Sequence, residues 1–142
     1  MGQDHCLTKE AGGSAMTTGF LFRQIHPHFF QDGRVISTAF KPTPKDERHL
    51  SAYNGEKFDA ESAYRHFVQN PKCESIGVLH TTRNICAEID LEVIDDNEPF
   101  DGHSSIVFGA KLTNSQIEKT AKKLTKLAWD CGWDYYAGSD ME

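Results

Sequence analysis

The strongest constraint on the fold is an amphipathic helix predicted near the end of the chain. Two overlapping Ser/Thr-x-x-Glu/Gln patterns, Thr113 with Gln116 and Ser115 with Glu118, are typical of a helix N-terminus, and Gly132 is typical of a C-terminal stop. Apolar residues recur at helical spacing on one side, and lysines occupy the other. Because such a stripe must be buried against another element, we expect a sheet beneath this helix. The stripe comprises Ile117, Ala121, Leu124, Ala128 and Cys131.

Short segments with β-branched, alternating or continuously apolar character are spread through the rest of the chain. The Asp32-Gly33 pair favours a turn, so we expect the first two segments to form a hairpin. A second helix is predicted from Asp59, a good N-cap, to Asn70, which Pro71 follows. This order predicts an α+β fold with a single mixed sheet of about five short strands and two principal helices. The candidate segments for these strands are 20–25, 34–40, 50–53, 75–82, 91–94 and 103–109.

The chain has 142 residues, which suits one domain with its own core. Residues 1–18 show no period and end in small residues, so we expect a flexible leader that need not belong to the native protein. The folded α+β domain is predicted to span 19–137, with a short tail over 138–142.

Composition excludes several function classes. The net charge of −6 argues against a general nucleic-acid coat, because neutralising phosphates requires concentrated Lys and Arg. No apolar run is long enough to span a bilayer, and no basic and apolar secretory leader opens the sequence. Cys6, Cys73, Cys86 and Cys131 lie far apart, whereas zinc sites need close ligand pairs. We therefore expect a cytoplasmic protein with free thiols, no metal and no cofactor.

The segment HPHFFQDGRVISTAFKPTPKDERHL, residues 26–50, is the best ligand candidate in the sequence. Prolines stiffen its backbone, and cationic, amide and hydroxyl side chains lie along it. Such a loop suits a phosphate or carboxylate, with Arg34 and Lys45 as anchors. Its mixed charges also fit an exposed loop that only keeps the protein soluble, and that alternative stays open. The predicted ligand-binding residues are Gln31, Arg34, Ser37, Lys45 and His49.

His26 and His103 are the candidates for catalytic acid–base chemistry. His103 and His80 each begin a His-x-Ser/Thr pattern, with Ser105 and Thr82 respectively. Paired patterns of this kind resemble those of the two-histidine phosphoesterases, in which imidazoles act as general acid and base and hydroxyls hold the phosphate. In that fold the two motifs belong to separate halves, whereas here they lie close together in the sequence.

Charge is distributed unevenly along the second half of the chain. Between Glu88 and Asp101 there are seven acidic residues and no Lys or Arg, whereas between Lys111 and Lys126 there are five lysines and one acid. This asymmetry predicts a basic partner for the acidic loop and an acidic partner for the helix. Two solvated surfaces would show the same pattern.

Three stretches carry a resemblance to known proteins: residues 26–55, the run DNEPFDGHSSIVF, and the run NSQIEKTAKKLTKLAWDCGW. From about Phe20 to Trp133 the chain resembles a group of small uncharacterised bacterial proteins found in mobile or accessory genome regions. The resemblance implies a cytoplasmic bacterial setting near phage defence or toxin–antitoxin systems, and no particular activity.

Two functions from different classes remain open. The first is a small binding or accessory module that engages a macromolecular partner, which we expect to be a protein. The alternative is a small enzyme acting on a nucleotide or phosphate ester, with His103 or His26 as acid or base and Arg34 or Lys45 as the phosphate anchor. An enzyme should gather these side chains around one concave pocket, whereas a binding module should scatter them.

Overall fold

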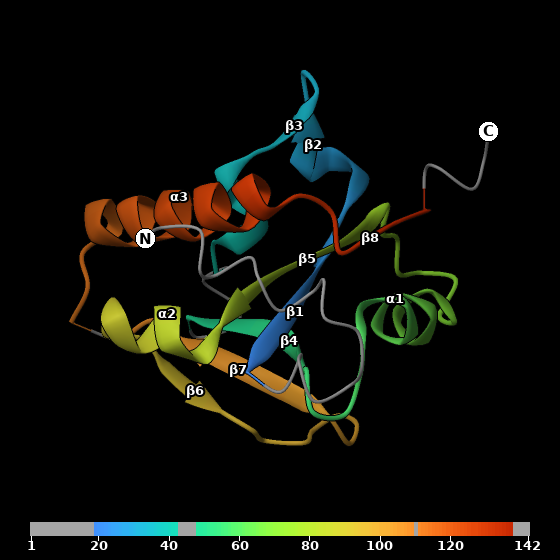
Figure 1. Cartoon of the computed structure of the whole chain (residues 1–142). Helices are drawn as coiled ribbons and strands as arrows, with labels where there is room; N and C mark the ends of the chain where they lie inside the picture. Colours follow the sequence, from blue (N-terminus) through green and yellow to red (C-terminus); the bar gives the residue numbers. More distant parts are fainter. Residues whose placement is uncertain (1–18, 43–47, 110, 138–142) are drawn as a thin grey trace.

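The computed structural model describes residues 19–42, 48–109 and 111–137. Its centre is a six-stranded sheet in the order β6-β7-β4-β1-β5-β8, in which every neighbouring pair is antiparallel (Figure 1). The strands of this sheet are β1 (Phe20–Ile25), β4 (His49–Asn54), β5 (Gly77–Thr82), β6 (Glu92–Ile94), β7 (His103–Val107) and β8 (Tyr135–Tyr136). The other elements are η3 (Pro27–Phe29), β2 (Phe30–Gln31), β3 (Arg34–Val35), η4 (Ser37–Phe40), α1 (Ala60–Val68), α2 (Arg83–Glu88) and α3 (Asn114–Cys131).

The predicted α+β class is confirmed, but the sheet has one strand more than expected and is antiparallel rather than mixed. The predicted hairpin between 20–25 and 34–40 is wrong. β1 is buried at every position except Arg23, which is half-buried, and it therefore becomes a central strand between β4 and β5. Residues 37–40 close into the 3-10 helix η4, because Ala39 and Phe40 are fully buried there beneath α3.

One face of the sheet is covered by α3, together with η4 and α2. The capping box of Thr113 and Gln116 is present, and the apolar stripe faces the sheet, with Leu124 fully buried. Glu118 instead forms an ion pair with Lys41 of the segment after η4, so the second predicted cap does not form.

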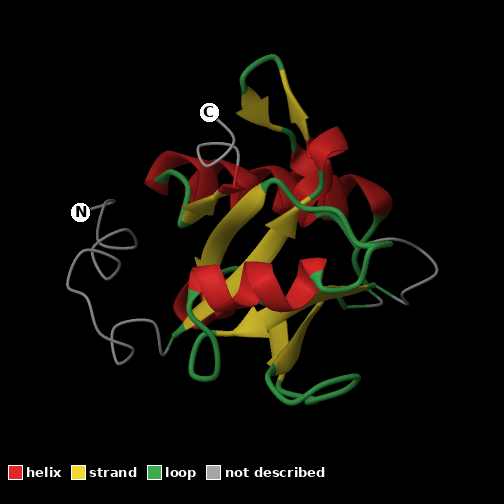
Figure 2. Cartoon of the chain, turned by 90° about the vertical axis from the view of Figure 1, so that its right-hand side faces the viewer, coloured by secondary structure: helices red, strands yellow, loops and turns green. Residues whose placement is uncertain are grey.

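The opposite face is covered by α1, which Figure 2 shows in front of the sheet with α3 behind it. Asp59 caps α1 as predicted, and its carboxylate accepts a 2.8 Å hydrogen bond from the backbone of Ser62. The apolar core on this side comprises Phe20, Phe22, Tyr53, Ala63 and Val78.

The sheet is not continuous between its two central strands. β1 pairs with β5 along its whole length, but it pairs with β4 only through Leu21 and Phe22. Beyond that point the side chain of Arg23 bridges the gap, with Nε donating to the Ala39 carbonyl at 2.7 Å and Nη1 to the Ser51 carbonyl at 2.9 Å. Side-chain hydrogen bonds thus replace backbone pairing there, and the sheet opens.

Other predictions fall partly within the described residues. None of the helices in those residues is long and apolar enough to cross a bilayer. Cys73 and Cys86 are free thiols as expected, whereas Cys131 is disulfide-bonded, contrary to expectation. Cys6, the predicted leader 1–18 and the predicted tail 138–142 lie outside the described residues.

Candidate active site

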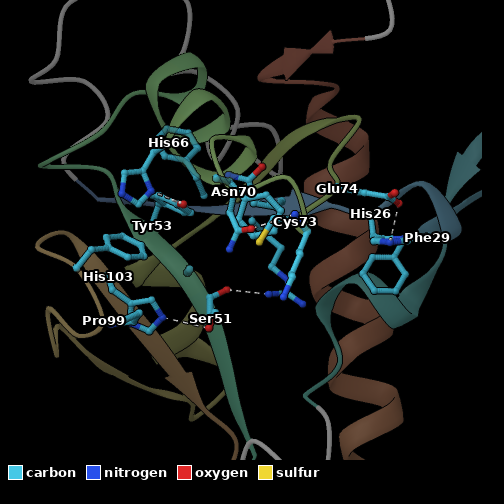
Figure 3. Close-up of a pocket in the computed structure, with 17 residues that line it drawn as sticks. His26, Phe29, Ser51, Tyr53, His66, Asn70, Cys73, Glu74, Pro99 and His103 are labelled. Carbon is cyan, nitrogen blue, oxygen red and sulfur yellow. Dashed lines mark hydrogen bonds and ion pairs between the residues drawn. The ribbon is translucent and has the colours of Figure 1, made fainter.

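A pocket of about 580 Å³ opens beside the gap between β1 and β4 (Figure 3). Ser51 and Tyr53 of β4 and His103 of β7 contribute to it from the sheet. α1 contributes His66, and the segment after α1 contributes residues 70 and 72–74. Pro99 and Phe100 come from the loop that precedes β7, and His26 and Phe29 from the chain after β1.

A chain of hydrogen bonds links Ser51, His103 and Asp96. In the β4–β7 register Tyr53 lies opposite His103 and Ser51 opposite Ser105, which places Ser51 and His103 diagonally on one face. His103 Nε2 lies 3.1 Å from Ser51 Oγ, and its Nδ1 lies 2.6 Å from Asp96 Oδ1 (Figure 3 shows the first contact). A carboxylate can only accept, so Nδ1 carries the proton and, in the neutral imidazole, Nε2 accepts from the Ser51 hydroxyl. This is the connectivity of a Ser-His-Asp triad.

Asp96 is fixed from two directions. Ser105 Oγ donates to Asp96 Oδ2 at 2.8 Å, while His103 holds the other carboxylate oxygen. Burial by itself would raise the pKa of Asp96, but the hydrogen bonds from His103 and Ser105 outweigh it and hold the pKa below its ordinary value. The carboxyl therefore stays ionised at neutral pH and orients the imidazole.

The loop that carries Asp96 is itself anchored. Its neighbour Asp95 accepts two hydrogen bonds from the Arg83 guanidinium, at 2.9 and 3.1 Å, and one from Ser104 at 2.6 Å. At the other end, Gly102 has φ +102°, and a Cβ there would lie 2.5 Å from the Phe58 ring. These contacts fix the loop against the sheet, and Asp96 with it.

The backbone N–H of Ser51 faces the gap in the sheet. Asn54 N donates to Gly102 O at 2.8 Å and Phe108 N to Arg48 O at 2.9 Å, so the ladder between β4 and β7 uses the even-numbered residues of β4. The N–H and C=O of Ser51 therefore point toward β1, which no longer pairs with β4 at that level. A donor on the nucleophile's own residue is a recurrent part of oxyanion holes.

A second polar pair lies on the wall that α1 contributes. Tyr53 OH is 2.9 Å from His66 Nδ1 (Figure 3). Burial, with a smaller contribution from Cys73, raises the pKa of Tyr53 above its usual range, so the phenol stays protonated. The Phe100 ring lies 4.5 Å from the His66 ring and 5.4 Å from the His103 ring, which puts an aromatic wall between the two histidines.

The structure brings only some of the sequence-predicted residues together. His26 and His103 both line the pocket, and His26 Nε2 lies 3.3 Å from Glu74 Oε1. The predicted ligand-binding residues Gln31, Arg34 and Ser37 are not among its lining residues, because β2, β3 and η4 lead the chain away from it. His49, the first residue of β4, does not line it either. Lys45 lies outside the described residues.

The two His-x-Ser/Thr motifs do not share a site. His80 is 2 % exposed, pairs with Asp134 at 2.8 Å, and stacks on the Phe20 ring at 3.8 Å. It does not line the pocket that contains His103. The phosphoesterase arrangement is therefore absent from the described residues, because one histidine is enclosed on the far side of β1.

Sequence reasoning missed Ser51, Asp96, Tyr53 and His66. The available signal was alternation: Ser51 and Tyr53 share one face of a predicted strand, as do His103 and Ser105 of another. What was lacking was the pairing of those strands. No group of three or more metal-ligating side chains occurs in the part of the chain that the structure describes.

Comparison with known proteins adds no relative to this account. No family model, no curated protein and no solved structure matches the chain. The function must therefore be argued from the site alone.

Proposed function

We propose that this protein is a small serine hydrolase that cleaves esters, with Ser51 as nucleophile, His103 as general base and Asp96 as the residue that orients His103. The hydrogen-bonded chain Ser51–His103–Asp96, with Ser51 exposed in the pocket, is the observation that carries this proposal. His103 keeps the acid–base role that the enzyme hypothesis gave it. Ser51, as a nucleophile, takes the place of the phosphate anchor.

The chemistry follows from the geometry. Ser51 Oγ attacks the ester carbonyl carbon as its proton passes to His103 Nε2. The charge on the carbonyl oxygen is stabilised by the Ser51 N–H, and the imidazolium by Asp96. Collapse breaks the bond to the leaving oxygen, which takes the proton from His103. Water then attacks the acyl carbon as His103 takes its proton; the bond to Ser51 Oγ breaks, Ser51 Oγ takes that proton from His103, and the acid is released.

The binding-module hypothesis receives less support. It expected His26, Arg34, Lys45 and His103 to be scattered. His26 and His103 line one pocket, whereas Arg34 does not line it and Lys45 lies outside the described residues. The acidic loop also uses its carboxylates within the chain: Asp95 binds Arg83, Asp96 binds His103, and Asp101 lies 3.2 Å from Lys57 Nζ. Three of the seven acidic residues in the run therefore bind partners within the chain, two of them at the site.

Release of nitrophenolate from p-nitrophenyl acetate tests the proposal. We expect the wild-type protein to turn over this ester and His103→Gln to reduce kcat/KM by roughly 10²–10⁴-fold, the usual contribution of a general base. His28→Gln is the matched control, because His28 is exposed and does not line the pocket. Exposed imidazoles hydrolyse activated esters slowly, and the control measures that background. Equal losses in the two variants, or no turnover by the wild type, would refute the hydrolase function.

A further inference from the structure

Two cations line the pocket. Among its lining residues Arg23 and Lys72 are cations, and Glu74 is the only carboxylate. Glu74 is engaged by His26 at 3.3 Å. Asp96 is a second ionised carboxylate at the site, behind His103, and it is held by His103 and Ser105. Both carboxylates are thus engaged within the chain, and cations that line a concave site attract anionic ligands.

Arg23 holds its charge next to the candidate nucleophile. Its Nη1 donates to the carbonyl of Ser51 itself, at 2.9 Å, and its Nε donates to Ala39 O at 2.7 Å. Two backbone acceptors therefore keep the guanidinium beside Ser51, and little side-chain entropy is lost when a ligand binds. Lys72, which is exposed, adds a second cation from the segment after α1.

The rest of the pocket is largely apolar. Phe22, Phe29, Phe67 and Phe100 line it together with Ala52. Rings of this kind bury an apolar body, while a few polar groups fix its orientation. The site therefore combines an apolar wall, a nucleophile and a positive end.

Resting on the hydrolase function above, we propose that the natural substrate is an ester with an apolar body and a second, anionic group, carboxylate or phosphate, bound by Arg23 and Lys72. A neutral ester would use the apolar wall and the triad but not the positive charge. The anion also orients the ester, because one end is attracted to the cations while the carbonyl lies at Ser51.

A matched pair of probes isolates the charge: p-nitrophenyl hydrogen adipate and its methyl ester, which differ by one carboxylate. We expect wild-type kcat/KM for the anionic probe to exceed that for the methyl ester by at least about tenfold, the low end of electrostatic focusing, and the preference to shrink with added salt. Lys72→Gln should reduce the preference. Lys126→Gln, an exposed lysine on α3, is the control and should leave the preference unchanged. Arg23→Gln should abolish the preference for the anionic probe if this variant folds. If it does not fold, the result for Lys72→Gln decides.

The outcomes separate the two proposals. If neither probe is cleaved, the hydrolase function fails and this inference fails with it. If both probes are cleaved equally, or if the preference persists in Lys72→Gln and in folded Arg23→Gln, the hydrolase stands and the anion site is wrong. Where the anionic probe is preferred, inhibition of its cleavage by inorganic phosphate and by adipate identifies the anion. The anion that inhibits the wild-type protein more strongly should no longer be the stronger inhibitor of Lys72→Gln. Inhibition by neither anion would overturn the assignment.

Discussion

Ser51→Ala is expected to reduce turnover of p-nitrophenyl acetate on the order of 10³-fold or more, because it removes the only atom that the triad delivers to the substrate. The fold should survive, since Ser51 is exposed and its side chain makes one hydrogen bond, to His103. Losing such a bond costs about 0.5–1.5 kcal/mol. Initial rates and thermal unfolding, measured on the same preparation, check both statements.

Ser37→Ala is the matched control for this variant. Ser37 lies in η4, does not line the pocket, and was predicted from sequence to bind a ligand. We expect its loss to leave the rate within about twofold of wild type, because surface substitutions away from a site have small effects. Should Ser51→Ala keep most of its activity while Ser37→Ala loses it, the site would belong with the 26–50 segment and not with the pocket.

Leu124→Asp is expected to unfold the protein at room temperature. Leu124 is fully buried at the centre of the α3 stripe. Removing a buried leucine side chain costs about 2–5 kcal/mol, and an unpaired carboxylate in its place adds a large desolvation penalty. Together these approach the roughly 5–15 kcal/mol by which such domains are stable. Far-UV circular dichroism and urea unfolding provide the measurement.

Lys123→Asp serves as the neighbouring control, because Lys123 is exposed on the same helix turn and the new carboxylate stays in water. We expect a change in stability within about 0.5 kcal/mol. A folded Leu124→Asp protein with a cooperative urea transition close to that of wild type would show that α3 presents another face to the sheet.

The helices were predictable because their signals are local. Asp59 and Thr113 cap α1 and α3 as their sequence patterns indicate, and the residues one turn apart around Leu124 are buried together. The strand order was not predictable in the same way. The register partners of β1 in β4 and β5 lie 31 or more positions further along the chain, and only the folded sheet specifies those partners.

The residues of the candidate site likewise divide into those with a local sequence signal and those that only the folded sheet brings together. His103 was identified as a candidate base, and it occupies the centre of the hydrogen-bonded chain. Ser51 was not identified, because it lies in an ordinary strand without the glycines of a nucleophile elbow. Asp96 was assigned to a partner-binding acidic loop because its role depends on β7 bringing His103 and Ser105 beneath that loop. Catalytic groups from three separate segments leave no motif in the sequence.

Labelling with a fluorophosphonate probe tests the central claim most directly, because an activated serine attacks phosphorus with displacement of fluoride and remains covalently modified. We predict a single adduct by intact-mass spectrometry, located by peptide mapping at Ser51, and its absence in His103→Gln and in urea-unfolded protein. No adduct under conditions that fully label a serine protease, or an adduct at another residue such as Tyr53, would contradict the assignment of Ser51 as the nucleophile.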